Sequence, residues 1–150
     1  AGMNGTAIEN FVCVIFNVSF MNCTWHVGRS ASGNTQYFLY WKNSKEDDFT
    51  GCQNYIRDNH GRHTGCRFQN VKIGAKGAQF LVNVSRSGQN IQSYEKMIML
   101  YEIVKLTPPL NITVNCTEAS HGCEIRWQPP RTTHVKKPSC FKYEIVIENK

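Results

Sequence analysis

Apolar side chains recur at every second position in several stretches of this chain, and this pattern constrains its fold more than any other feature. In residues 110–116 (LNITVNC) apolar and polar residues alternate without interruption. The same period of two occurs in residues 78–85, 123–128 and 141–148. Successive side chains of a β-strand point to opposite faces, so each stretch predicts a strand with one face on a core and the other in water. The chain is therefore predicted to be all-β.

Two segments depart from this alternation. Residues 35–42 (TQYFLYWK) carry apolar side chains on both phases, which predicts a central strand covered on both faces. Residues 94–104 show no clear phase, because Met97 to Tyr101 form a continuous apolar run. Turn-forming residues cluster between the predicted strands, at residues 27–34, 57–61, 73–77 and 86–90.

The chain has seven cysteines and no C-x-x-C motif, which argues against a zinc knuckle or a thioredoxin-like redox pair. Cys13 and Cys23 flank an expected reversal near Val18, so they should face each other on neighbouring strands. Trp25 lies two residues beyond Cys23 and therefore on the same face of its strand.

Local pairing predicts three disulfides and one unpaired thiol: Cys13–Cys23, Cys52–Cys66 and Cys116–Cys123, with Cys140 left over. The strand geometry favours these pairs, although spacing alone allows other connectivities.

Six Asn-x-Ser/Thr sequons indicate the extracellular compartment. They are Asn4, Asn17, Asn22, Asn83, Asn111 and Asn115. A sequon is the acceptor of N-glycosylation and disulfides persist in oxidising compartments, so the two features together predict an extracellular glycoprotein. The longest apolar runs are five residues, whereas a membrane span needs about 20. The first ten residues lack a signal-peptide pattern, so we expect a processed piece of a longer protein.

Thr107-Pro108-Pro109 divides the chain into two parts. Prolines cannot donate to a ladder and they stiffen the backbone, which predicts a semi-rigid elbow. The predicted boundaries are an N-terminal tail at 1–9, a first sandwich at 10–106, the elbow at 107–109 and the start of a second sandwich at 110–150. The last part is long enough for three strands of the about seven that a sandwich needs, so it is expected to be incomplete.

No residue pattern predicts catalysis. The five histidines have no carboxylate at a fixed spacing, and four of them lie in predicted turns or linkers. They are His26, His60, His63, His121 and His134. The G-x-S-x-G, H-E-x-x-H and phosphate-loop motifs do not occur in the sequence. We therefore predict a protein that is not an enzyme, with no cofactor and no metal site.

The net charge of +6 suggests an anionic partner, but the basic residues are dispersed, and Lys136-Lys137 is their longest run. This dispersion argues against nucleic acid. Weak binding of heparan sulfate stays open as an alternative.

Cys13 and the run Cys23-Thr24-Trp25, with nine residues between the two cysteines, resemble the C-x9–10-C-x-W signature of class I cytokine receptors. Several short runs add to the similarity: Asn10-Phe11, residues 21–25, 36–40 and 43–45, Gly65-Cys66, residues 80–83, and Trp127. Together they extend over most of residues 5–130. They are similar to the branch of the family that contains the granulocyte-macrophage colony-stimulating factor receptor alpha subunit, with the interleukin-3, interleukin-5 and interleukin-13 receptor alpha chains as relatives. The setting of Cys140 before Phe141 is more similar to the interleukin-5 and interleukin-13 chains.

This resemblance implies a pair of fibronectin type III-like, immunoglobulin-like β-sandwiches that bind a helical cytokine at their elbow. The implied partners are a short-chain cytokine, such as granulocyte-macrophage colony-stimulating factor, and a shared receptor beta chain. The expected ligand contacts lie in two loops, residues 70–76 and 131–137, and are Lys72, Lys76, Arg131, Lys136 and Lys137. The implied location is the ectodomain of a single-pass cell-surface receptor, or a secreted form. A soluble decoy or carrier for the same cytokines and an adhesion module that binds none of them stay open as alternatives.

Overall fold

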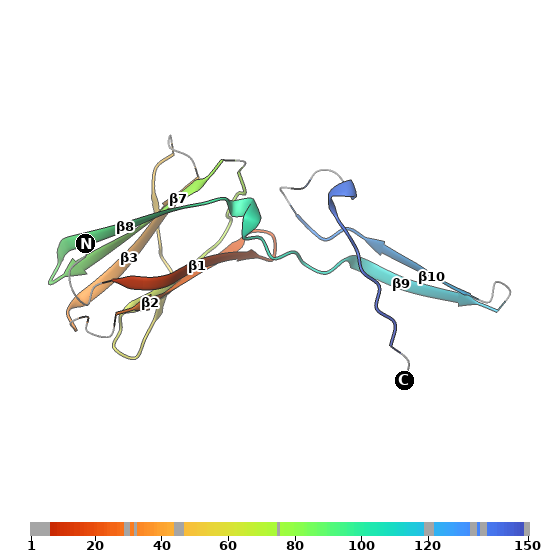
Figure 1. Ribbon diagram of the computed structural model, residues 1–150, viewed down its shortest axis with the longest axis horizontal. Coiled ribbons are helices and arrows are strands. Elements are labelled where there is room, and N and C mark those ends of the chain that lie inside the picture. Colours follow the sequence, from red (N-terminus) through yellow and green to blue (C-terminus); the bar gives the residue numbers. More distant parts are fainter. Residues whose placement is uncertain are drawn as a thin grey trace.

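The computed structural model describes residues 7–28, 31, 33–43, 47–74, 76–118, 122–132, 135 and 138–148. Two four-stranded antiparallel sheets pack face to face as a sandwich, and a two-stranded sheet follows beyond a linker (Figure 1). The all-β sandwich predicted from the sequence is thereby confirmed.

The first sheet has the order β1-β2-β6-β5 and contains β1 (Ile8–Phe16), β2 (Phe20–Val27), β6 (His63–Phe68) and β5 (Tyr55–Arg57). The second sheet has the order β4-β3-β7-β8 and contains β4 (Thr50–Gly51), β3 (Thr35–Lys42), β7 (Ala78–Arg86) and β8 (Gln89–Ile98). The third sheet is the hairpin of β9 (Leu110–Thr117) and β10 (Gly122–Gln128). Two short 3₁₀ helices, η1 (Leu100–Glu102) and η2 (Pro138–Cys140), complete the described elements.

The core lies between the first two sheets and is formed mainly by alternate residues of β1, β2, β3 and β7, as the period of two requires. In β7, for example, Ala78, Phe80, Val82 and Val84 are buried while the residues between them are half-buried. The first and second sheets share an aromatic row at the centre of this core. Phe80 of β7 contacts Phe11 of β1 and Trp41 of β3, with ring centroids 5.9 Å apart in each case. The row thus crosses the interface and ties the sheets together.

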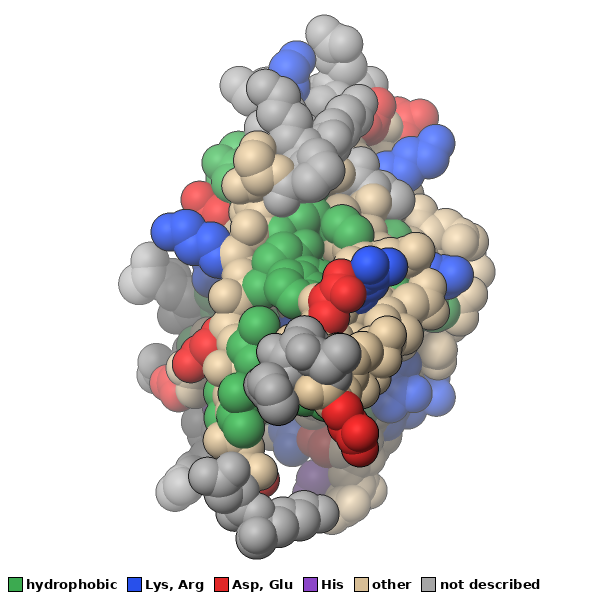
Figure 2. All heavy atoms as spheres, turned by 90° about the vertical axis from the view of Figure 1, so that its right-hand side faces the viewer, with side chains coloured by type: hydrophobic (Ala, Val, Ile, Leu, Met, Phe, Trp, Pro, Cys, Tyr) green, Lys and Arg blue, Asp and Glu red, His purple; other side chains and the backbone are tan. Residues whose placement is uncertain are grey.

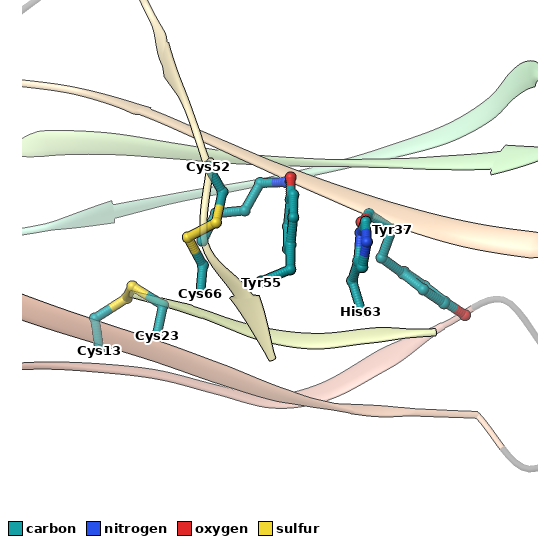
Figure 3. Close-up of a disulfide and its surroundings, with 8 residues drawn as sticks. Cys13, Cys23, Tyr37, Cys52, Tyr55, His63 and Cys66 are labelled. Atoms are coloured by element: carbon teal, nitrogen blue, oxygen red, sulfur yellow. A yellow bond between two sulfur atoms is a disulfide. The ribbon is translucent and has the colours of Figure 1, made fainter. Parts of the chain in front are cut away.

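Three disulfides join Cys13 to Cys23, Cys52 to Cys66 and Cys116 to Cys123, the pairs expected from the sequence. Figure 3 shows the first two of them. Cys13 and Cys23 are directly opposite in the β1–β2 ladder, and Cys116 and Cys123 are opposite in the β9–β10 ladder. Cys140 is a free, exposed thiol.

The disulfide between Cys52 and Cys66 links the two sheets. Cys52 follows β4, and its N–H donates to the carbonyl of Leu39 in β3 of the second sheet (3.0 Å). Cys66 lies in β6 of the first sheet, so the bond closes the side of the sandwich where the chain passes from one sheet to the other.

Two expectations from the sequence are wrong. The strand at residues 35–42 is not covered on both faces, because Tyr37, Leu39 and Trp41 are buried while the alternate residues are only half-buried. Residues 141–148 form no strand. They have the alternating pattern, but a strand needs a ladder partner, and no described strand pairs with them.

The segment at residues 94–104, which had no clear phase, divides into two elements. It continues β8 to Ile98 and then forms η1, in which Leu100 is buried and Tyr101 is 47% exposed. The turn expected at 86–90 is shorter than predicted, because β8 already begins at Gln89.

Candidate functional site

The loop between β6 and β7, residues 69–77, is fixed to the sandwich by its backbone. Val71 is buried, and its N–H donates to the carbonyl of Ser19 (2.9 Å). Asn43, at the end of β3, donates from Nδ2 to the carbonyl of Lys72 (2.9 Å). The side chains of Lys72 and Lys76 are exposed. The loop is therefore held to the sandwich at Val71 and Lys72, and it presents the cations of Lys72 and Lys76 to solvent.

The partner of this loop is the reversal between β1 and β2. Asn17 and Val18 have positive φ angles of 47° and 74°, and the N–H of Ser19 donates to the carbonyl of Asn17 (2.9 Å). This is a tight turn at the place that the sequence predicted. The rings of Phe16 and Phe20 stack beside it with centroids 5.8 Å apart. Phe20 remains 38% exposed and adds an aromatic surface to this end of the sandwich.

The linker toward the β9–β10 hairpin leaves from the same end. Ile15, near the end of β1, donates to the carbonyl of Ile103 (2.9 Å) and accepts from the N–H of Lys105 (2.6 Å). These bonds fix residues 103–105 beside β1, two residues from the β1–β2 turn. The loop 69–77, the turn and the departing linker therefore lie together at one end of the sandwich, as Figure 1 also shows.

The remaining expected contact residues are placed less completely. Arg131 is exposed just beyond the end of β10. Lys136 and Lys137 lie outside the described residues. The structure thus brings Lys72 and Lys76 into one loop next to the linker, whereas the basic cluster of the 131–137 loop remains an expectation.

An apolar hollow beside the linker was not predicted. It has a volume of about 450 Å³ and is lined by Leu106, Pro109, Ile112, Val114, Trp127 and Tyr143 among other residues. Figure 2 shows the corresponding hydrophobic side chains gathered at the end of the molecule that carries the hairpin. The signal for this hollow was present in the sequence, since Ile112 and Val114 lie on the apolar phase of β9 and this part of the chain was expected to be an incomplete sandwich.

The histidine with the strongest constraints has a structural setting. His63 of β6 is 6% exposed, and its Nδ1 lies 2.7 Å from the carbonyl of Tyr37 in β3. A carbonyl can only accept, so Nδ1 carries the proton and donates. The ring stacks on Tyr55 with centroids 3.7 Å apart, and the Tyr55 hydroxyl accepts from the N–H of Leu39 (2.9 Å; Figure 3). Burial lowers the pKa of His63, and the Tyr37 carbonyl opposes this effect. The His63 imidazole is therefore neutral, and with Tyr55 it holds β5 and β6 against β3.

Two further features of the described part of the chain concern metal binding and membrane insertion. Within those residues no group of three His, Cys, Asp or Glu side chains could hold a metal ion. No helix among them is long and apolar enough to cross a membrane.

Comparisons with known proteins point to one family. A family model described as "Interleukin-6 receptor alpha chain, binding" matches residues 10–103. The human interleukin-5 receptor subunit alpha is 32% identical over 163 residues, which cover 99% of this chain and 37% of that protein. The rat interleukin-13 receptor subunit alpha-2 is 30% identical over 149 residues, which cover 97% of this chain and 37% of that protein. The mouse interleukin-13 receptor subunit alpha-1 is 26% identical over 147 residues, or 96% of this chain and 33% of that protein.

This chain therefore spans between 33% and 37% of the length of these relatives. The similarity supports the interleukin-5 and interleukin-13 receptor alpha chains, in agreement with the setting of Cys140, and gives no specific support to the granulocyte-macrophage colony-stimulating factor receptor.

Proposed function

The chain belongs to the class I cytokine receptor family, and from this premise we propose that it is a cytokine-binding part of a receptor alpha chain and contacts a short-chain helical cytokine at the linker end of its sandwich. Members of this family are receptors and not enzymes. The observation that supports the proposal most directly is the fixed loop 69–77. Its backbone is bound to Ser19 and Asn43, and it presents Lys72 and Lys76 next to the departing linker.

The rigidity of the loop matters for binding. Loops carried by a rigid sandwich are the usual place for recognition residues, and a pre-ordered loop loses less conformational entropy when it meets a partner. Val71 and Asn43 order this loop before any ligand arrives, while the lysine side chains remain free to meet carboxylates.

The charge of the loop supports an anionic cytokine surface. Lys72 and Lys76 contribute to the net charge of +6 of the chain. Complementary charge raises the association rate more than the lifetime of a complex. Arg131, Lys136 and Lys137 extend the proposed contact into the second part of the chain. The exposed rings of Phe20 and Tyr101 add apolar area at the same end.

The cytokine and the signalling partner are finer proposals. The relatives are named as receptors for interleukin-5 and interleukin-13, so a short-chain cytokine of their class is the favoured ligand, with granulocyte-macrophage colony-stimulating factor as a further candidate. In this proposal a shared receptor beta chain joins the complex afterwards. A soluble decoy or carrier would bind the same cytokine without that second step, and an adhesion module would bind none of the candidates.

The test uses a two-module ectodomain of the parent protein on a capture surface, with the three cytokines injected at several salt concentrations. The loop variant is Lys72→Glu/Lys76→Glu. The matched control is Arg57→Glu/Arg67→Glu, which makes the same change of charge at two exposed residues of β5 and β6. We expect the loop variant to slow association about tenfold and to weaken its salt dependence, with little change in dissociation.

Equal effects of the two variants would place the contact surface elsewhere. Binding of none of the cytokines by a folded ectodomain would favour the adhesion module. Adding a soluble beta chain to the captured complex separates the signalling receptor from the decoy, because only the receptor complex gains mass.

A further inference from the structure

Two methionines, one near the end of β8 and one just beyond it, pack directly on the loop 69–77. Gly77 is the last residue of this loop before β7 begins at Ala78. A β-carbon added to Gly77 would lie 3.0 Å from Cε of Met97 and 3.3 Å from Sδ of Met99. The space that a side chain at this position would need is therefore occupied by the two thioether side chains, which lie against the backbone of Gly77.

This contact lies in the second half of the loop, beyond the hydrogen bonds to Ser19 and Asn43. Those two bonds fix the backbone of Val71 and Lys72. Lys76 is exposed and directly precedes the glycine that the methionines cover. The packing of the two thioethers therefore gives the loop a further point of attachment to the sandwich, next to its second cation.

Both methionines are open to small solutes. Met97 is 58% exposed. Met99 is half-buried, and the two side chains together line an open hollow of about 320 Å³ between β8 and β1. Met21 of β2, in contrast, is 0% exposed and belongs to the core. A dissolved oxidant can therefore reach Met97 and Met99 in the folded protein, whereas it reaches Met21 only when the sandwich opens.

We propose that Met97 and Met99 form an oxidisable site that regulates the order of the loop 69–77, with a hydroperoxide as the oxidant. In the reaction with hydrogen peroxide, a lone pair of the thioether sulfur attacks one peroxide oxygen. An S–O bond forms as the O–O bond breaks, and the departing hydroxide takes the proton of the transferred hydroxyl and leaves as water. The sulfur loses two electrons and the peroxide gains them, so the products are methionine sulfoxide and water.

The sulfoxide no longer suits the contact with Gly77. Its oxygen is polar, and burial of a polar group without a hydrogen-bond partner is unfavourable. Because oxidation converts a flexible apolar side chain into a polar one, the modified side chains turn to solvent and release the end of the loop. A less ordered loop loses more conformational entropy on binding. Oxidation thus weakens the contact of Lys76 with a cytokine, and this consequence, unlike the modification itself, rests on the function proposed above.

Peptide mass spectrometry of the parent ectodomain, treated with hydrogen peroxide for increasing times, tests the site itself. The exposed thiol of Cys140 is alkylated first, so that it consumes no peroxide. We expect Met97 to form sulfoxide about tenfold faster than Met21, because Met21 reacts only through opening of the core, and Met99 to lie between the two. Met3 lies outside the described residues and is followed by its own peptide. A rate for Met97 no higher than that for Met21 would overturn the proposal.

Amide exchange tests the attachment of the loop. In the oxidised protein we expect peptides from residues 73–78 to exchange about threefold faster, whereas the N–H of Val71, bonded to the Ser19 carbonyl, keeps its rate. The control is Met97→Leu/Met99→Leu, which retains apolar side chains of similar volume and cannot form a sulfoxide. Peroxide should leave the loop of this variant unchanged. Faster exchange in both proteins, or in neither, would overturn the proposal.

Cytokine binding tests the consequence. Peroxide should weaken the affinity of the wild type about threefold and leave that of the leucine variant unchanged, and methionine sulfoxide reductases should restore the oxidised wild type. The reductase step needs no variant, so the test holds even if the double substitution prevents secretion. Equal weakening of both proteins, or no recovery, would show that another modification is responsible. A folded ectodomain that binds no cytokine would refute the proposed function and this consequence, while the sulfoxide and exchange measurements still decide the site.

Discussion

Phe80 connects the two sheets, and its removal gives a direct measure of their packing. The side chain is 1% exposed and contacts Phe11 and Trp41. Phe80→Ala removes a buried ring and leaves a cavity, a change that destabilises proteins by about 3–5 kcal/mol. The walls here belong to two sheets joined by the disulfide between Cys52 and Cys66, so collapse around the cavity is restricted. We therefore expect a loss near the upper end, about 4 kcal/mol, or about 15–30 °C in melting temperature.

Urea unfolding measures this loss, followed by fluorescence in a Trp127→Phe background so that the signal comes from the buried Trp25 and Trp41. Phe80→Leu retains most of the volume and should cost about 1 kcal/mol. Phe20→Ala is the control, since Phe20 is 38% exposed, and it should cost about 1 kcal/mol or less. If Phe80→Ala were no more destabilising than Phe20→Ala, at an unchanged denaturant slope, the aromatic row would not be what joins the sheets.

Three further predictions concern the histidine, the inter-sheet disulfide and the hairpin. Burial lowers the pKa of His63 in the folded state, so the stability it contributes is present above its unfolded pKa of about 6.5 and is lost as the pH falls below that value toward the folded pKa. Melting curves from pH 8 to 5 should show this loss of stability, and a His63→Gln variant with the same pH profile would refute the assignment to His63. Replacing Cys52 and Cys66 by serine opens a link with a sequence separation of 14 and should cost about 3 kcal/mol in denaturant unfolding, whereas an unchanged midpoint would show that the core alone holds the sheets. Amide exchange in β9 and β10 should be faster than in β3, because Ile112 and Val114 are 59% and 62% exposed; equal protection would mean that another surface covers the hairpin.

The sandwich could be predicted because each local signal agreed with the global fold. Cys13 and Cys23 were expected to be opposite each other, and the β1–β2 ladder places them so. The reversal near Val18 followed from the same spacing. A period of two and a disulfide spacing are local properties, so a single sequence contains them.

The errors arise where the outcome depends on distant residues. Residues 141–148 have the alternation of a strand, but pairing needs a neighbour that alternation cannot supply. In β3, apolar residues on both phases suggested two covered faces. The outer-phase ring of Phe38 instead packs against Tyr55 and His63 where the chain crosses between the sheets. The position of the loop 69–77 next to the linker likewise follows from bonds to Ser19 and Asn43, which no local pattern announces.

The hydrogen bonds between Ile15 and the residues 103–105 leave few torsions free between the two parts of the chain. The N–H of Lys105 is still bound to β1, so the chain is held as far as the backbone nitrogen of that residue. Pro108 and Pro109 each fix φ near about −65°. The residue before a proline is held in an extended conformation, which restricts Thr107 and Pro108 as well. The direction in which the chain leaves the sandwich toward the β9–β10 hairpin is therefore set chiefly by the torsions of Lys105 and Leu106 and by ψ of Pro109.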